Sequence, residues 1–212
     1  FIADLAGLGL DGEGIVVFAS GFVDPAANNG GPGFGLFAVT RSGGDAVALP
    51  TTGLARGQII HNAADPAAAT VDIYVNTLTD TVFFDDVDFR SATPFVNLPS
   101  GYPLDIRVNL PTSTAIDDQP VDTFAVTAVD GETYALVANG VLDPATFAAN
   151  PDAVATDFTI LVEAGVQEAA ANAADIDLKI LHGATDAPSV GVNANGATVV
   201  PSATYTDFTG YL

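Results

Sequence analysis

The chain has 212 residues, of which 49% are hydrophobic and 15% charged, so it can bury a core and is long enough for one large or two ordinary domains. Its 26 acidic and 5 basic residues give a formal net charge of −21, which argues against binding to nucleic acid or to an anionic membrane surface. Because it has no cysteine, a zinc–thiolate site, a disulfide framework and a cysteine nucleophile are excluded. No apolar run reaches the about 18 residues of a membrane span, so we expect no membrane insertion.

The first 54 residues contain two stretches that return later in the chain. GLDGEGIVVFASGFVDPAANN, which begins at Gly9, resembles AVDGETYALVANGVLDPATFA, which begins at Ala128. FGLFAVTRSG at Phe34 likewise resembles FTILVEAG at Phe158. The sequence begins at Phe1 with no signal-peptide pattern before it, so we expect a mature or partial product.

Residues 7–12, GLGLDG, satisfy the G-x-G-x-x-G pattern of dinucleotide-binding loops. That motif needs a strand before it and a helix after it, so that the glycines open onto the pyrophosphate. The equivalent stretch of the later copy, VTAVDG, lacks the first two glycines and runs into another strand. We therefore interpret residues 7–12 as a hairpin turn.

The middle of the chain, residues 55–174, holds short runs that are apolar or that alternate between apolar and polar residues. In chain order these runs are GQIIHNA, TVDIYVN, TPFVNLP, LDIRVNL, DTFAVTAV, TYALVANGV and FTILVEA, separated by Asp, Gly, Pro and Asn. About seven short strands in roughly 120 residues are typical of a sandwich. The sequence thus predicts an all-β fold, an immunoglobulin-like Greek-key β-sandwich.

Two related stretches begin with a histidine: HNAADPAAATVDIYVN at His61 and HGATDAPSVGVNAN at His182. With the matches described above, they divide the chain into three pieces. Residues 55–174 form a complete repeat, residues 1–54 match its second half, and residues 175–212 match its first half. We therefore expect one complete sandwich flanked by two complementary half-domains.

The stretch IIHNAADPAAATVDIYVN and its weaker copy ILHGATDAPSVGVNANG resemble the opening signature of the family catalogued as domain of unknown function 4397. AVDGETYALVANG is similar to a later strand of that family. The resemblance implies secreted or cell-surface bacterial and archaeal proteins with tandem β-sandwiches, and it implies no activity. In the second copy, Gly191 stands where the aspartate of the strand would fall. The first copy matches at His61, Asp65, Pro66, Val71, Asp72, Ile73, Tyr74 and Val75, and the second at His182, Asp186, Ala187, Pro188 and Val190.

His61 and His182 could act as catalytic bases, because histidine titrates near neutral pH. Each follows an apolar strand and precedes a turn, without a serine or cysteine nucleophile at matching positions. We interpret both as structural histidines that bond to loop backbone or to the nearby aspartate. Paired carboxylates for glycoside hydrolysis are the alternative that the sequence leaves open, but four glutamates and no tryptophan make it unfavourable, and we expect no enzyme.

Two acidic loops are candidate calcium sites, because calcium prefers clusters of hard oxygen ligands. FFDDVDF contains Asp85, Asp86 and Asp88, and AIDDQPVD contains Asp117, Asp118 and Asp122. Neither loop has the spacing or the closing glutamate of an EF-hand. We interpret both as solvated acidic loops, with weak calcium binding as the alternative and no other cofactor.

These observations favour a structural subunit of an extracellular filament, surface layer or cell-surface stalk of a prokaryote. We expect its partners to be copies of itself, joined head-to-tail into a homopolymer by completion of the half-domains. The alternative is a secreted adhesin, or a module that binds carbohydrate or calcium. A second alternative concerns the chain itself, which could belong to a longer continuous tandem array.

Overall fold

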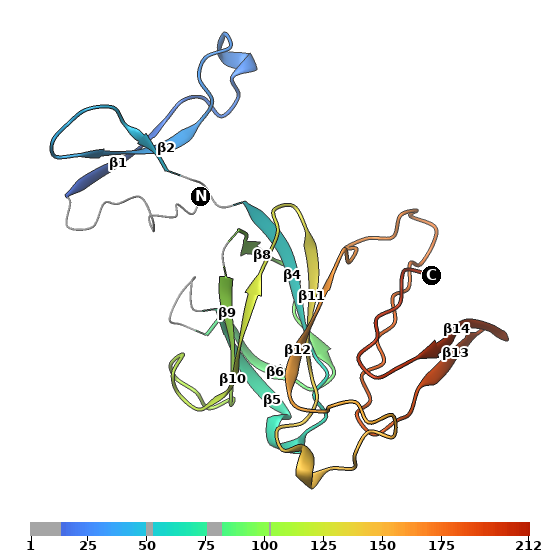
Figure 1. Cartoon of the computed structure of the whole chain (residues 1–212). Coiled ribbons are helices and arrows are strands. Elements are labelled where there is room, and N and C mark those ends of the chain that lie inside the picture. The colour runs from blue at the N-terminus through green and yellow to red at the C-terminus, as the bar shows by residue number, and fades with distance from the viewer. Residues whose placement is uncertain (1–13, 50–52, 76–81, 102) are drawn as a thin grey trace. The chain divides into compact units, whose positions relative to one another are not determined.

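The computed structural model describes residues 14–49, 53–75, 82–101 and 103–212, whose regular elements are β-strands and three short 3-10 helices (Figure 1). The predicted all-β class is confirmed. The chain divides into two compact units, Phe1–Gly53 and Leu54–Leu212. Among the described residues, no helix is long and apolar enough to cross a membrane. The turn predicted at residues 7–12 lies outside the described residues.

The first unit contains a three-stranded sheet in the order β1-β2-β3. β1 and β2 are antiparallel, and the connection between them includes a short 3-10 helix. The rings of Phe18 and Phe37 stack across this pair with 5.9 Å between their centroids. The bounds are β1 Ile15–Ser20, the helix Ala26–Asn28, β2 Gly35–Thr40 and β3 Val47–Ala48.

The second unit contains a sandwich of two sheets (Figure 1). One sheet has the order β10-β9-β5-β6, and its bounds are β5 Thr70–Val75, β6 Phe84–Asp88, β9 Pro103–Asn109 and β10 Pro120–Thr127. The other has the order β12-β11-β4-β7, and β8 also pairs with β4. Its bounds are β4 Leu54–His61, β7 Ser91–Ala92, β8 Val96–Pro99, β11 Thr133–Asn139 and β12 Thr159–Ala164.

The core lies between these two sheets and is filled by alternate residues of strands such as β5, β9 and β11, because successive side chains of a strand point to opposite faces. β5 shows the pattern that the sequence predicts, but its polar face is covered as well: Asp72 and Tyr74 are fully buried. Ser113, in the loop between β9 and β10, contacts both of these side chains. The core side chains include Ala55, Ile59, Val71, Ile73, Val75, Leu104, Ile106, Val108, Leu136 and Ala138.

Residues 175–212, here called the C-terminal segment, follow the sandwich within the same unit. They contain the hairpin of β13 (Val190–Ala194) and β14 (Ala197–Ala203). On either side of this hairpin, residues 178–182 and 206–212 run antiparallel and exchange backbone hydrogen bonds. The bonds include Leu212 N to Leu178 O at 3.0 Å and Thr206 N to His182 O at 2.8 Å.

Gly140 follows β11 and begins the turn that leads to β12. Its φ is +91°, and a β-carbon there would lie 2.3 Å from the carbonyl oxygen of Asp157. Gly21, which follows β1, has the same geometry: φ is +90°, and a β-carbon would lie 2.1 Å from the carbonyl oxygen of Gly33. The two turns are therefore built in the same way, and both need glycine for space as well as for φ.

We expect Gly140→Ala to destabilise the second unit more than Gly131→Ala does. Gly131 also has a positive φ (+75°), but nothing lies within 4 Å of its added β-carbon. The backbone cost alone is about 1–3 kcal/mol, and the clash at Gly140 adds about 1–3 kcal/mol. Urea unfolding of both variants measures the difference. Equal losses would contradict the requirement for space at Gly140.

Candidate functional site

The first candidate site is the turn after β4, where His61 is fully buried. Its Nε2 lies 2.7 Å from the carbonyl oxygen of Ala68, and its ring meets that of Phe89 edge-on. Asp65 caps the following 3-10 helix Pro66–Ala68 by accepting from Ala67 N at 2.8 Å. These contacts tie the imidazole to the backbone of its own loop.

Asp65 also links this turn to a second one. Its Oδ2 accepts a hydrogen bond from the backbone N–H of Leu142 at 2.9 Å. Leu142 lies two residues after Gly140, in the turn that follows β11. The carboxylate therefore joins the turns at the ends of β4 and β11, which lie next to each other because the two strands are parallel.

His182 occupies an equivalent turn in the C-terminal segment. Its Nε2 lies 3.0 Å from the carbonyl oxygen of Pro188, and its ring meets that of Tyr205 edge-on. Thr206 N donates to His182 O as Arg90 N donates to His61 O. Asp186, at the position of Asp65, differs from it because it is exposed.

Burial lowers the pKa of His61 below its ordinary value, while the hydrogen bond to Ala68 and the charge of Asp88 act in the opposite direction. The folded state therefore disfavours the imidazolium form. Below the ordinary pKa of histidine the unfolded chain binds a proton that the folded chain does not, so the stability due to His61 is lost as the pH falls.

We expect His61→Gln to weaken the decline in stability between about pH 7 and about pH 5, because an amide does not titrate in this range. At about pH 7 the variant should cost about 1–2 kcal/mol through an altered buried hydrogen bond. Urea unfolding at both pH values measures the two effects. His182→Gln controls for the loss of an imidazole, and the same pH slope in wild type and His61→Gln would contradict the assignment.

The second candidate site is a cluster of three carboxylates, from Asp72 on β5 and from Asp85 and Asp86 on β6. One oxygen of each lies within 4.8 Å of the others, a spacing that could hold a cation. Asp72 is buried and accepts from Asp86 N at 3.0 Å and from Ser113 Oγ at 2.7 Å. Burial, together with the charges of Asp72 and Asp86, raises the pKa of Asp85.

The other acidic candidates lie elsewhere and have local partners. Asp88 accepts from Thr70 Oγ1 at 2.7 Å, and Asp117 pairs with Arg107. The remaining two cap backbone N–H groups: Asp118 accepts from Thr114 N at 3.0 Å, and Asp122 accepts from Thr123 N at 2.7 Å. In the described ranges, none of these four belongs to a group of three potential metal ligands.

We expect Asp85→Asn to raise the melting temperature at about pH 7 and to have less effect at about pH 5, because the folded state favours the protonated form of Asp85 and loses stability as that proton leaves. If calcium occupies the cluster, CaCl₂ should raise the melting temperature of the wild type more than that of the variant. Asp88→Asn, on the same strand but outside the cluster, is the control. A lower melting temperature for Asp85→Asn without added calcium would contradict the repulsion.

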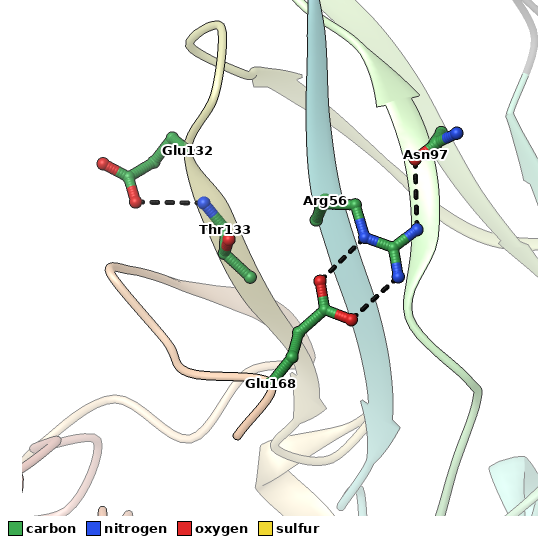
Figure 2. A network of polar contacts seen from close by, with 5 residues as sticks. All are labelled: Arg56, Asn97, Glu132, Thr133 and Glu168. Carbon is green, nitrogen blue, oxygen red and sulfur yellow. Dashed lines mark hydrogen bonds and ion pairs between the residues drawn. The ribbon is translucent and has the colours of Figure 1, made fainter. Parts of the chain in front are cut away.

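An ion pair attaches the chain after β12 to the sandwich. Figure 2 shows Arg56 of β4 between Glu168 and Asn97 of β8. The guanidinium donates to both carboxylate oxygens of Glu168, at 2.7 and 2.8 Å, and to Asn97 Oδ1 at 3.0 Å. The pair raises the pKa of Arg56 and lowers that of Glu168. Both side chains are more than a third exposed, so solvent screens the pair and it contributes little to stability.

The C-terminal segment is attached to the sandwich by further polar contacts. Asn139 donates to Tyr205 Oη at 2.9 Å, and Asn62 donates to Asn139 Oδ1 at 2.8 Å and to Gly183 O at 3.3 Å. A β-carbon at Gly183 would lie 2.2 Å from the amide nitrogen of Asn62, so a larger residue at this position would require the Asn62 side chain to move. Beside this junction lies a hollow of about 950 Å³, whose lining includes Ile60, Val137, Phe95, Leu181 and Tyr211.

The third candidate site is the outer edge of β1, which has no partner strand among the described residues. In the second unit β11 lies between β12 and β4, whereas among the described residues β1 pairs with β2 alone. The apolar side chains of the two strands differ in exposure. Val17 of β1 is 47% exposed, whereas Leu136, at the equivalent position of β11, is 1% exposed. An unpaired edge with exposed apolar side chains is a surface for strand addition.

Comparison of the chain with protein-family models, with curated proteins and with solved structures found no match. The resemblance to the domain of unknown function 4397 family therefore rests on the signature residues alone.

Proposed function

We propose that the protein is a structural, non-enzymatic subunit of an extracellular filament or cell-surface assembly, in which neighbouring copies complete each other's sandwiches. One observation carries this proposal. The hydrogen bonds of β11 and β12 recur in the first unit, and those around β4 recur in the C-terminal segment. Among the described residues, each outer piece thus contains strands of the β4–β11 sheet that the other lacks.

The first unit repeats the pairing of β11 with β12. Ser20 pairs with Gly35 as Asn139 pairs with Thr159, at the ends of the respective strands. After the glycine of each turn, the residues that lead to the next strand form equivalent backbone hydrogen bonds. Phe22 N donates to Pro32 O at 2.8 Å and Phe34 N to Phe22 O at 2.9 Å, whereas the second unit has Val141 N to Thr156 O and Phe158 N to Val141 O, both at 2.9 Å.

The C-terminal segment repeats the surroundings of β4. Ile180 N donates to Thr209 Oγ1 at 2.9 Å, and Ile59 N donates to Thr93 Oγ1 at 3.0 Å. The backbone bonds match as well: Thr209 N donates to Ile180 O at 2.8 Å, and Thr93 N donates to Ile59 O at 2.9 Å. This segment therefore holds a β4-like strand with its antiparallel neighbour and no β11-like strand beside it among the described residues.

Burial of exposed apolar side chains would drive the association of the first unit of one copy with the C-terminal segment of the next. Val16, Val17, Phe18, Leu178 and Leu212 are all more than a third exposed. Burial of apolar surface yields about 25 cal/mol per Å², and a strand added to an open edge also satisfies backbone groups. Because the contact joins two different surfaces, it is head-to-tail and extends into a fibre unless it closes into a ring.

Two strands of the complete sandwich, β9 and β10, have no equivalent among the described residues of the outer pieces. The proposed joint therefore builds the sheet that contains β4 and β11. In a longer tandem array the same joint would form within one chain. Denaturing electrophoresis of the natural protein distinguishes the two cases, because the 212 residues have a mass of 21.4 kDa and an array runs far larger.

We expect the purified chain to form linear filaments in electron micrographs, and Val17→Asp to abolish them, because the new carboxylate would be buried in the joint. Val129→Asp is the matched control: Val129 is also an exposed valine, but it lies in the complete sandwich. Light scattering should detect large particles for wild type and control, and a single 21.4 kDa species for Val17→Asp. A wild-type chain that stays monomeric in low and high salt would contradict the proposal.

The second candidate function is a calcium-binding surface module, and the Asp72–Asp85–Asp86 cluster favours it. Three carboxylates repel one another unless a cation lies between them. A calcium-dependent fold combined with the absence of filaments would favour this function over the first.

A further inference from the structure

We infer that the joint between neighbouring copies is a parallel strand ladder in which Phe18 of one copy lies opposite Leu181 of the next. This inference rests on the proposed function and adds to it the partner segment and the register. It is derived from the pairing of β4 with β11, where the described residues contain the complete arrangement.

β4 and β11 run parallel in an unbroken register. Ile60 is opposite Val137, and His61 is opposite Ala138. The ladder continues one residue further, where Asn62 N donates to Ala138 O at 2.8 Å. The register is thus defined relative to the turns that end the two strands.

The same turns fix the equivalent positions in the outer pieces. Gly21 corresponds to Gly140, since both have φ near +90° and both lie against a carbonyl of the returning chain. Phe18 precedes its glycine by three residues, as Val137 does. His182 corresponds to His61, so Leu181 corresponds to Ile60.

Transfer of the register places Phe18 opposite Leu181 and Ala19 opposite His182. Gly183 N would then donate to Ala19 O, as Asn62 N donates to Ala138 O. The edges are compatible with this pairing. The backbone bonds described for residues 178–182 run to 206–212, on the side where β4 meets β7 and β8.

The exposure of two residues outside the strands supports the same register. Val23 is 88% exposed, against 38% for its counterpart Leu142, and Asp186 is exposed although its counterpart Asp65 is buried. Val23 follows Gly21 by two residues, as Leu142 follows Gly140. In the joint Asp186 would therefore accept a hydrogen bond from Val23 N, as Asp65 accepts one from Leu142 N. Both residues acquire the partners that their counterparts have.

Cysteine pairs test the register, because the chain contains no cysteine of its own. Neighbouring strands lie about 4.8 Å apart, within the Cα separations of about 4.4–6.8 Å that a disulfide spans. Oxidation of the double variant Phe18→Cys/Leu181→Cys should move most of the protein from the monomer band into a ladder of covalent oligomers on non-reducing electrophoresis. Reduction should return it to the monomer.

Val17→Cys/Leu181→Cys is the matched register control. A shift of one residue places the two side chains on opposite faces of the sheet, so this variant should form no ladder. Ile60→Cys/Val137→Cys is the positive control for geometry, because this pair occupies the template position and should close within one chain. Asp186→Ala should reduce assembly without lowering the melting temperature of the monomer, whereas Asp175→Ala, in the same segment, should not affect assembly.

The outcomes distinguish failure of the register from failure of the proposed function. Filaments without a ladder from Phe18→Cys/Leu181→Cys would overturn the register and leave the proposed function standing. A ladder from the Val17→Cys/Leu181→Cys control alone would show that the register differs by one residue, which would overturn the proposed pairing of Phe18 with Leu181. A disulfide that closes within a single chain would overturn the intermolecular joint. Wild-type monomers without filaments or cross-links would overturn both claims.

Discussion

The parallel pairing of β4 with β11 is the constraint on which the rest of the second unit depends. β4, β7 and β8 come from the first half of the repeat and β11 and β12 from the second, so this ladder alone joins the halves within their sheet. Because the strands are parallel, their following turns lie at the same edge. One of these turns is shaped by His61 and the other by Gly140, and Asp65 links them. His61 and Asp65 therefore lie where the two halves of the sheet meet.

Much of the fold could be predicted because strand periodicity is local information. The alternation in TVDIYVN predicts the buried face of β5, and the structure has Val71, Ile73 and Val75 in the core. The burial of Asp72 and Tyr74 could not be predicted in this way. It depends on the loop between β9 and β10, which reaches back to β5 through Ser113.

The acidic cluster shows why spacing alone does not define a site. The sequence groups Asp85 and Asp86 with Asp88, whereas the structure groups them with Asp72 of the neighbouring strand. The pairing of β5 with β6 is irregular, and Asp86 has a φ of +52°, so the alternation of sides breaks there. Which carboxylates meet depends on strand pairing and a local irregularity, and neither leaves a signal in one sequence.

The end of the chain illustrates a repeat that sequence comparison misses. YTDFTGYL, at residues 205–212, follows the path of FRSATPFV, at residues 89–96, although the two share little beyond one threonine. The shared threonine makes the contacts that the two stretches have in common: Thr93 and Thr209 form the same side-chain and backbone hydrogen bonds to the strand beside them. The first residue of each stretch is aromatic and packs on the histidine.

An open edge with apolar side chains would pair with any exposed strand, so a chain that carries one needs protection against wrong contacts. The net charge of −21 supplies a general repulsion between copies, which salt screens over about 10 Å at 0.1 M. Repulsion of this kind favours no particular register. In the proposed joint, specific contacts would select the register: the hydrogen bond from Val23 N to Asp186 at one end of the ladder, and the fit of alternate apolar side chains along it. A long-range repulsion that only the correct short-range contacts overcome would allow the same chain to stay soluble and to assemble in one way.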